Sequence, residues 1–285
     1  MTVSTVFMRF PGGRVKALTL SYDDNVTEDV RLAGIMRAHG IRGTFNINSG
    51  QFSPEGSVGD VGKHGHRRLT LSESQELHAA GDMEVACHGV THPFLEQLPA
   101  PLCLREIEED RASLEQIYGR MVRGLAYPFG TYNDSVIAAA VSCGIVYART
   151  VVDSRAFLLP EDWMKWDPTC HHTVPDLMEL AQRFLNEKRR WRPMLFYLWG
   201  HSYEFEDTDS WQIIEDFCGL MGGRDDIWYA TNIEIHDYVE AYRQLVFSAD
   251  GTKVMNPTAT ELWLEYRGRT YPVAPGSAAE ITTDK

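Results

Sequence analysis

The sequence lacks the features that mark membrane-spanning, disulfide-rich and nucleic-acid-binding proteins. No stretch approaches 18 consecutive apolar residues, so no membrane-spanning helix is expected. The cysteines are odd in number, five, and no two have CxxC spacing, which favours reduced thiols. The 27 Lys and Arg residues against 40 Asp and Glu residues leave a net charge of −13, which argues against general nucleic-acid or anionic-membrane binding. The first residues do not resemble a secretory signal, so we expect a cytoplasmic protein.

What is present is the pattern of an α/β protein of 285 residues. Apolar runs that predict buried strands alternate with amphipathic runs that predict helices, and the second helix is expected to begin with Ser72 as its N-cap. This alternation favours a parallel sheet covered by helices. The predicted strands are 15–22, 43–48, 83–87, 124–127, 145–148, 194–199 and 227–230, and the predicted helices are 27–39, 72–80, 102–118, 133–142, 175–188, 211–220 and 233–245.

The last segment has a different character. Residues 262–266 alternate between apolar and polar side chains, Arg267-Gly268-Arg269 resembles a hairpin turn, and residues 270–273 can return as a strand. We therefore divide the chain into a domain at 1–250 and a small β-hairpin appendage at 251–285.

Polar residues follow several predicted strands at the points where these strands end. Asp23-Asp24, His88, the segment 127–130 and His201 each follow a different apolar run. The carboxyl ends of parallel strands open on one face, and this face carries the active site in such folds. These residues are therefore predicted to converge on one site.

Two imidazoles and a carboxylate in this set have the chemistry of metal ligands. His88 and His92 lie four residues apart, and Asp24 can add an oxygen ligand, which suits Zn²⁺, with Co²⁺ or Ni²⁺ as alternatives. A cation beside Asp24 would relieve the repulsion between the adjacent carboxylates and leave Asp23 free as a base. The competing interpretations are that the two aspartates favour a helix N-terminus, that His92 is a solvated loop residue, and that His201 is a core histidine.

Four segments resemble motifs of the polysaccharide deacetylases, the NodB-homology or carbohydrate esterase family 4 group. Leu20-Ser-Tyr-Asp-Asp-Asn25 is similar to their T-F-D-D-G motif, and His88–His92 to their H-(S/T)-x-x-H motif. Leu125-Ala-Tyr-Pro-Phe-Gly130 and Leu198-Trp-Gly-His201 resemble the third and the last motif. The resemblance covers about residues 15–245.

This resemblance implies a distorted (β/α)₇ barrel, NodB-like, and metal-dependent removal of acetyl groups from N- or O-acetylated sugars or oligosaccharides. It implies that Asp23 is the general base and His201 the general acid, and that Asp24, His88 and His92 hold a divalent metal ion. Phe129, through its main-chain N–H, and Tyr127 are the candidates for oxyanion and substrate contacts.

The sequence also departs from the family pattern. Asn25 replaces a glycine, and Ala126 stands where the family often has an arginine that orients the base. The acidic residue that tunes the last histidine is predicted to be Asp167, with Asp153 as the alternative. His172, Trp166 and Trp199 are further candidates for substrate contacts, and Tyr203 is expected near the mouth of the site.

Two other functions stay open at this stage. The same barrel could hydrolyse another C–N bond, in an amide or ureide small molecule. The chain could also be a carbohydrate-binding relative without activity, which would predict the loss of a metal ligand or of the base.

Overall fold

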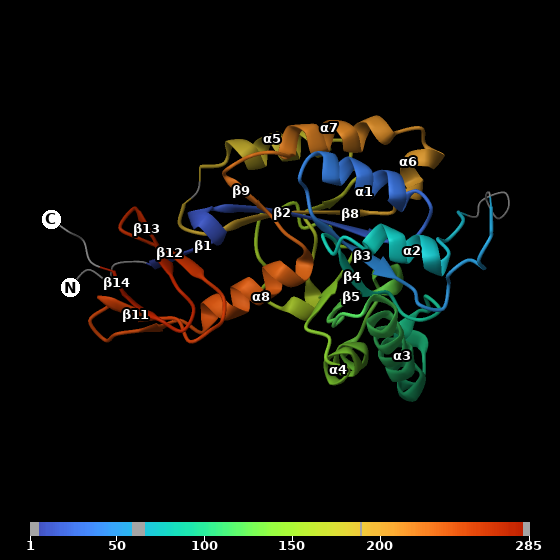
Figure 1. Ribbon diagram of the computed structural model, residues 1–285, viewed down its shortest axis with the longest axis horizontal. Helices are drawn as coiled ribbons and strands as arrows, with labels where there is room; N and C mark the ends of the chain where they lie inside the picture. Colours follow the sequence, from blue (N-terminus) through green and yellow to red (C-terminus); the bar gives the residue numbers. More distant parts are fainter. Residues whose placement is uncertain (1–5, 59–65, 189, 282–285) are drawn as a thin grey trace.

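A curled sheet of parallel strands forms the centre of the protein (Figure 1). The structure, a computed structural model, describes residues 6–58, 66–188 and 190–281. The strand order is β6-β5-β4-β3-β2-β8-β7, β9 also pairs with β2, and every pair is parallel. The strands are β2 (Lys16–Asp23), β3 (Gly43–Ile47), β4 (Glu84–Cys87), β5 (Gly124–Ala126), β6 (Tyr147–Arg149), β7 (Cys170–His171), β8 (Met194–Gly200) and β9 (Ile227–Tyr229).

An irregular segment closes the gap between β6 and β8. Trp166 donates its backbone N–H to Ala148 at 3.0 Å and accepts from Thr150 at 3.1 Å, both beside β6. Three residues later, Thr169 donates to Tyr197 of β8 at 2.8 Å. The ring of strands is thus completed without a regular strand at this position, which confirms the predicted distorted (β/α)₇ barrel and locates its distortion.

Helices cover the outside of the barrel. Figure 1 shows α1, α5 and α7 along one side of the sheet and α3 and α4 beside each other on the opposite side. The spacing of apolar residues explains the packing: α5 buries Leu177, Leu180, Ala181 and Phe184, which share one face at helical periodicity. The helices are α1 (Asp29–Ala38), α2 (Leu71–His78), α3 (Ala100–Tyr118), α4 (Asp134–Ser142), α5 (Leu177–Asn186), α6 (Tyr203–Asp207), α7 (Trp211–Met221) and α8 (Asn232–Arg243).

Two small antiparallel sheets lie at one end of the molecule. The predicted hairpin is confirmed as β12 (Leu262–Tyr266) and β13 (Arg269–Val273), and both turn residues, Arg267 and Gly268, have positive φ, as a tight hairpin turn requires. Strand β1 (Val6–Arg9) pairs with β12, and β10 (Val246–Phe247), β11 (Lys253–Met255) and β14 (Ala278–Glu280) form the second sheet. The first sheet therefore joins both ends of the described chain, and the domain boundary at 250 stays a prediction.

None of the helices in the described ranges is long and apolar enough to cross a bilayer. The sequence also predicts a surface insertion at 49–68, which is rich in Gly, Ser and His, and residues 59–65 of this segment lie outside the described residues. Its last residues contact the barrel, since Arg68 reaches Asp24 at the end of β2.

Candidate metal and active site

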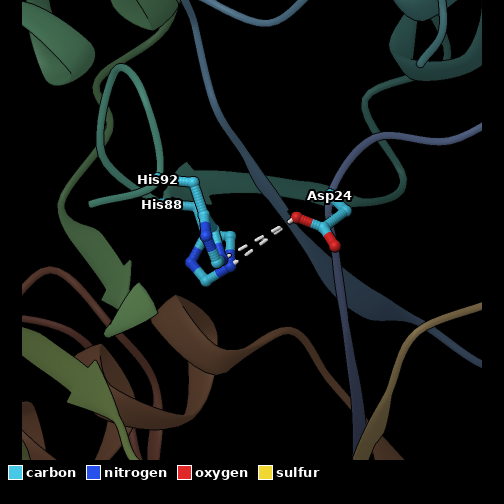
Figure 2. A group of neighbouring side chains, drawn as sticks. All are labelled: Asp24, His88 and His92. Carbon is cyan, nitrogen blue, oxygen red and sulfur yellow. Dashed lines mark ion pairs between the residues drawn. The ribbon is translucent and has the colours of Figure 1, made fainter. Parts of the chain in front are cut away.

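The three predicted metal ligands lie together at the carboxyl ends of β2 and β4 (Figure 2). One ligand atom of each residue lies within 4.8 Å of the others. Oδ1 of Asp24 is 4.0 Å from Nε2 of His88 and 4.0 Å from Nε2 of His92. Two imidazole nitrogens and a carboxylate oxygen converging in this way are a donor set suited to zinc or a similar divalent cation.

The protonation state of His88 is the one that a metal ligand requires. Nδ1 of His88 lies 2.8 Å from the carbonyl oxygen of Ala126, which only accepts hydrogen bonds, so Nδ1 carries the proton. Burial lowers the pKa of His88 to about 4, so the ring is neutral and Nε2 presents a lone pair. This buried nitrogen has no hydrogen-bond partner and faces Asp23 at 3.7 Å and Asp24 at 4.0 Å. A lone pair that faces two carboxylates is repulsive unless a cation lies between them.

The base candidate, Asp23, is almost completely buried and held on both oxygens. Its Oδ1 accepts a hydrogen bond from Asn46 at 2.8 Å, and its Oδ2 accepts one from Nη2 of Arg149 at 2.5 Å. Burial alone would raise the pKa of Asp23, but Arg149, followed by His88 and His201, outweighs burial and lowers it to about 2. The carboxylate is therefore ionised at neutral pH, as a base must be.

Arg149 is the residue that sequence reasoning missed. It stands at the end of β6, directly opposite Ala126 in the pairing of β5 with β6. Paired residues of neighbouring parallel strands point to the same face of the sheet. A side chain at position 149 therefore points to the same face as one at position 126, where the motif that this segment resembles often has an arginine. Arg123, three residues before Ala126, forms an ion pair with Asp237 instead. An arginine that follows the apolar run 145–148 was the available signal.

The acid candidate, His201, follows β8 and faces Asp23 across 3.8 Å from its Nε2. Its other nitrogen, Nδ1, lies 3.5 Å from Oε1 of Glu204. Burial would lower the pKa of His201, but Glu204, Asp23 and Asp24 outweigh burial and raise it. This shift favours the protonated ring that an acid requires.

The structure does not bring the predicted tuning residues to His201. Asp167 accepts a hydrogen bond from the Thr150 hydroxyl, and Asp153 accepts one from the backbone N–H of His171 at 2.8 Å. Within the described residues, neither carboxylate forms a hydrogen bond or ion pair with His201. The prediction rested on sequence proximity alone, and the carboxylate that reaches His201 is Glu204.

A pocket of about 460 Å³ opens over these groups. Phe129 lies at its rim with 49% of its surface exposed, and its ring contacts His92 with 4.4 Å between ring centroids. The Tyr127 hydroxyl is directed elsewhere, since it donates to the carbonyl of Met164 at 2.9 Å. The lining residues are the predicted Asp23, Asp24, His88, His92, Tyr127, Phe129, Trp199, His201 and Tyr203, joined by Gly130 and Val151.

Two of the predicted substrate contacts do not line this pocket. Trp166 is 1% exposed and packs against Tyr147 and Tyr197 in the core, because its segment closes the barrel. His172 is 2% exposed and stacks between Tyr22 and Phe205. Of the three side chains proposed from sequence, only Trp199 reaches the pocket.

Backbone strain is concentrated at this site. Of the seven non-glycine residues with positive φ in the described chain, four are Asp24, Asn25, His92 and Phe129. Asn25, at φ 54, takes the left-handed conformation expected of a residue that replaces glycine. Such conformations cost about 1–3 kcal/mol each and persist where the surrounding structure enforces them, typically at functional sites.

The comparisons with known proteins agree with the motifs. A family model described as polysaccharide deacetylase matches residues 10–148. The crystal structure of a putative polysaccharide deacetylase from Mycobacterium smegmatis is 17% identical, with 82% of this chain and 93% of that chain covered and a TM-score of 0.59, which shows a shared fold. No curated protein matches the chain.

Two further solved structures were found. A peptidoglycan deacetylase, PdaC from Bacillus subtilis, is 16% identical, with 80% of this chain and 93% of that chain covered and a TM-score of 0.49. The deacetylase PplD from Streptococcus pyogenes is 22% identical, with 46% of this chain covered and a TM-score of 0.40. The match spans about half of the streptococcal protein, 54% of its length.

The four motifs lie at the ends of their strands around one pocket, and the family match covers the segment that supplies both aspartates and both candidate ligand histidines. Residues 10–148 therefore match the polysaccharide deacetylase family model, and the chain shares its fold with the structure from Mycobacterium smegmatis.

Proposed function

We propose that this protein is a metal-dependent deacetylase that hydrolyses the acetamide of an N-acetylated sugar or oligosaccharide. The observation that carries this proposal is the buried Nε2 of His88, a neutral lone pair that faces two carboxylates and has no partner. Asp24, His88 and His92 would hold the cation, with zinc favoured by two imidazole ligands. A divalent cation held there supplies a Lewis acid that polarises an acyl carbonyl and lowers the pKa of water.

The base in this proposal is Asp23. Its carboxylate is ionised at neutral pH, and its Oδ2 lies between His88 and His201, at 3.7 and 3.8 Å from their Nε2 atoms. Arg149 and Asn46 fix its orientation, so it can accept a proton from an attacking water without a conformational change.

The acid in this proposal is His201. An amine is a poor leaving group unless it is protonated as the C–N bond breaks, and the raised pKa of His201 provides that proton near neutral pH. The main-chain N–H of Phe129, at the rim of the pocket, is the candidate donor to the oxyanion. A positioned donor of this kind stabilises the transition state by about 3–4 kcal/mol.

The pocket has the size and lining of a small-ligand site. Its volume of about 460 Å³ falls in the range of about 300–1,000 Å³ that such sites occupy. Trp199, Tyr203 and Phe129 offer aromatic surfaces to a sugar ring beside the polar groups. This combination supports an acetylated sugar as the substrate.

The proposal is tested by measuring acetate released from N-acetylglucosamine, chitooligosaccharides and O-acetylated sugars. We expect turnover that a chelator abolishes and that zinc, cobalt or nickel restores, and we expect Asp23→Asn to be inactive while it still binds zinc. A cyclic ureide in the same panel addresses the competing C–N substrate. Absence of acetate from every acetylated sugar with the metal-loaded chain would refute the proposal.

A further inference from the structure

One carboxylate, that of Glu204, contacts three histidines next to the pocket. Glu204 lies in the first turn of α6, three residues after His201. Its Oε2 is 3.2 Å from Nε2 of His171 and 3.2 Å from Nε2 of His172, and its Oε1 is 3.5 Å from Nδ1 of His201. Segments that are distant in sequence, around β7 and α6, thus meet at a single side chain.

The two oxygens of Glu204 have different surroundings. Oε2 also accepts a hydrogen bond from the backbone N–H of His201 at 3.2 Å, as an acidic residue at a helix start commonly does. A purely structural role at the start of α6 would explain this contact alone. It does not explain why Oε1 faces the His201 ring or why two imidazoles lie within 3.2 Å of Oε2.

His172 is built into the core in a way that fixes this arrangement. Its ring stacks on Phe205 with 4.1 Å between ring centroids, and a Cβ added to Gly200 would lie 2.0 Å from its Nδ1. Burial lowers the pKa of His172 to about 3, so the ring is neutral and can donate only one proton. Its Nε2 lies 3.2 Å from Oε2 of Glu204, a close electrostatic contact without the geometry of a hydrogen bond.

We propose that Glu204 is a positioning residue that orients the His201 ring by placing a negative charge beside Nδ1, with His171 and His172 contacting its other oxygen. This proposal rests on the proposed function, in which His201 is the acid. It replaces Asp153 and Asp167, which do not reach the ring, with a carboxylate carried by the helix that follows His201 itself.

The charges around His201 explain why this carboxylate matters. Asp23 at the end of β2 and Asp24 directly after it act on the ring. Between ring centroids, Tyr203 of α6 lies 5.1 Å away and His171 of β7 lies 6.3 Å away. With a cation held at Asp24, these two carboxylates would lose part of their effect on His201. Glu204 acts on the opposite nitrogen, Nδ1, and its own pKa is lowered by its histidine contacts although burial opposes this.

The test uses the full-length, zinc-loaded chain and the substitution Glu204→Gln. Glutamine keeps the shape and an oxygen acceptor for the His201 backbone N–H but removes the negative charge. Glu206→Gln is the matched control, because Glu206 lies on the same helix and accepts a hydrogen bond from Trp211. NMR titration of the His201 ring should show a pKa about 1–3 units lower in Glu204→Gln and unchanged in the control.

A second measurement separates positioning from folding. Protonation of the leaving group matters for an amide but not for an aryl acetate, whose phenolate leaves without a proton. Glu204→Gln should therefore reduce kcat on the acetamide sugar on the order of 10²-fold and leave the aryl acetate rate nearly unchanged. Equal losses on both substrates, or an unmoved His201 pKa, would overturn the proposal. If the wild-type chain releases no acetate, the deacetylase function fails, and the titration still decides whether Glu204 sets the His201 pKa.

Discussion

Replacing Arg149 by methionine should remove most of the activity and a measurable part of the stability. Nη2 of Arg149 lies 2.5 Å from Oδ2 of Asp23, and both side chains are at most 3% exposed. The remainder of the guanidinium packs on the Trp199 ring, 4.5 Å from its centroid. Methionine keeps much of this packing volume and removes the charge, so the variant leaves Asp23 as a buried carboxylate without its cation.

The size of the effect follows from the pKa of Asp23. Burial opposes ionisation, and Arg149 is the strongest of the groups that bring this pKa to about 2. Losing an adjacent cation raises a carboxyl pKa by about 1–3 units, or about 1.4–4 kcal/mol. Breaking a buried ion pair costs about 3–5 kcal/mol. We therefore expect the free energy of unfolding at pH 7 to fall by about 3 kcal/mol.

The pH dependence has a definite sign. A carboxyl whose native pKa is depressed below the unfolded value of 3.8 stabilises the fold above that pH, and this stabilisation is lost as pH falls towards 2. The stability difference between wild type and Arg149→Met should therefore be largest at neutral pH and shrink below about pH 4.

Activity at pH 7 should decline because Asp23 loses its orientation rather than its charge. A raised pKa of about 3–5 still leaves the carboxylate ionised at pH 7. A base displaced by about 1 Å costs on the order of 10²-fold, which we expect in kcat for acetate release. Denaturant unfolding measures the stability. Arg149→Lys keeps the charge but not the planar guanidinium, so its kcat and its stability should lie between those of the wild type and Arg149→Met. If Arg149→Met kept both kcat and its unfolding midpoint, our account of Asp23 would be wrong.

Three further predictions address the ligands, a buried acid and the pocket rim. His88→Ala should abolish stoichiometric zinc binding in equilibrium dialysis, and an intact one-to-one ratio would contradict the ligand assignment. Burial raises the pKa of Asp29 to about 8, so the native chain keeps a proton that the unfolded chain releases, and the free energy of unfolding should fall as pH rises from about 4 to 8. In urea titrations, Asp29→Asn should reduce this dependence of the unfolding free energy on pH. An unchanged dependence would contradict a protonated Asp29 in the native chain. Phe129→Gly relieves a positive φ of 58° and keeps the main-chain N–H. We therefore expect kcat to change by less than about tenfold, while KM rises because the aromatic surface is lost. A large loss of kcat would assign the ring itself a role in the reaction.

Periodicity and strand ends were sufficient to predict much of this molecule from sequence. The apolar run 15–22 became β2, and the acidic pair after it reached the same face as His88 and His201 because parallel strands share an orientation.

The residue that caps a helix was less predictable. We expected Ser72 to cap α2, but Thr70 does so, and it forms a reciprocal capping box with Glu73. Two hydroxyl residues, Thr70 and Ser72, lie at the start of that helix, and only the tertiary position of the segment selects between them.

The residues that sequence reasoning missed act across the sheet or across one helical turn. Asp153 and Asp167 were chosen because they precede β8 in the chain, but their segment closes the barrel and directs them to local partners. Glu204 was not among the residues selected from the sequence, because its contacts with His171 and His172 depend on where β7 ends. Contacts of this kind depend on strand order and register, which no single segment encodes.

The register between β5 and β6 allows a test of whether the guanidinium can act on Asp23 from a different position. Ala126 and Arg149 are paired, so a guanidinium can approach Asp23 from either strand. The charge and its orientation are expected to matter rather than residue 149 itself. The double variant Ala126→Arg/Arg149→Ala should therefore have a kcat at least about tenfold higher than Arg149→Ala, because the ion pair with Asp23 is rebuilt from the neighbouring strand. Ala126 is buried, so Ala126→Arg alone, which adds a second buried cation, should be less stable than the double variant. Additive losses in the double variant would show that Arg149 acts through something other than its pair with Asp23.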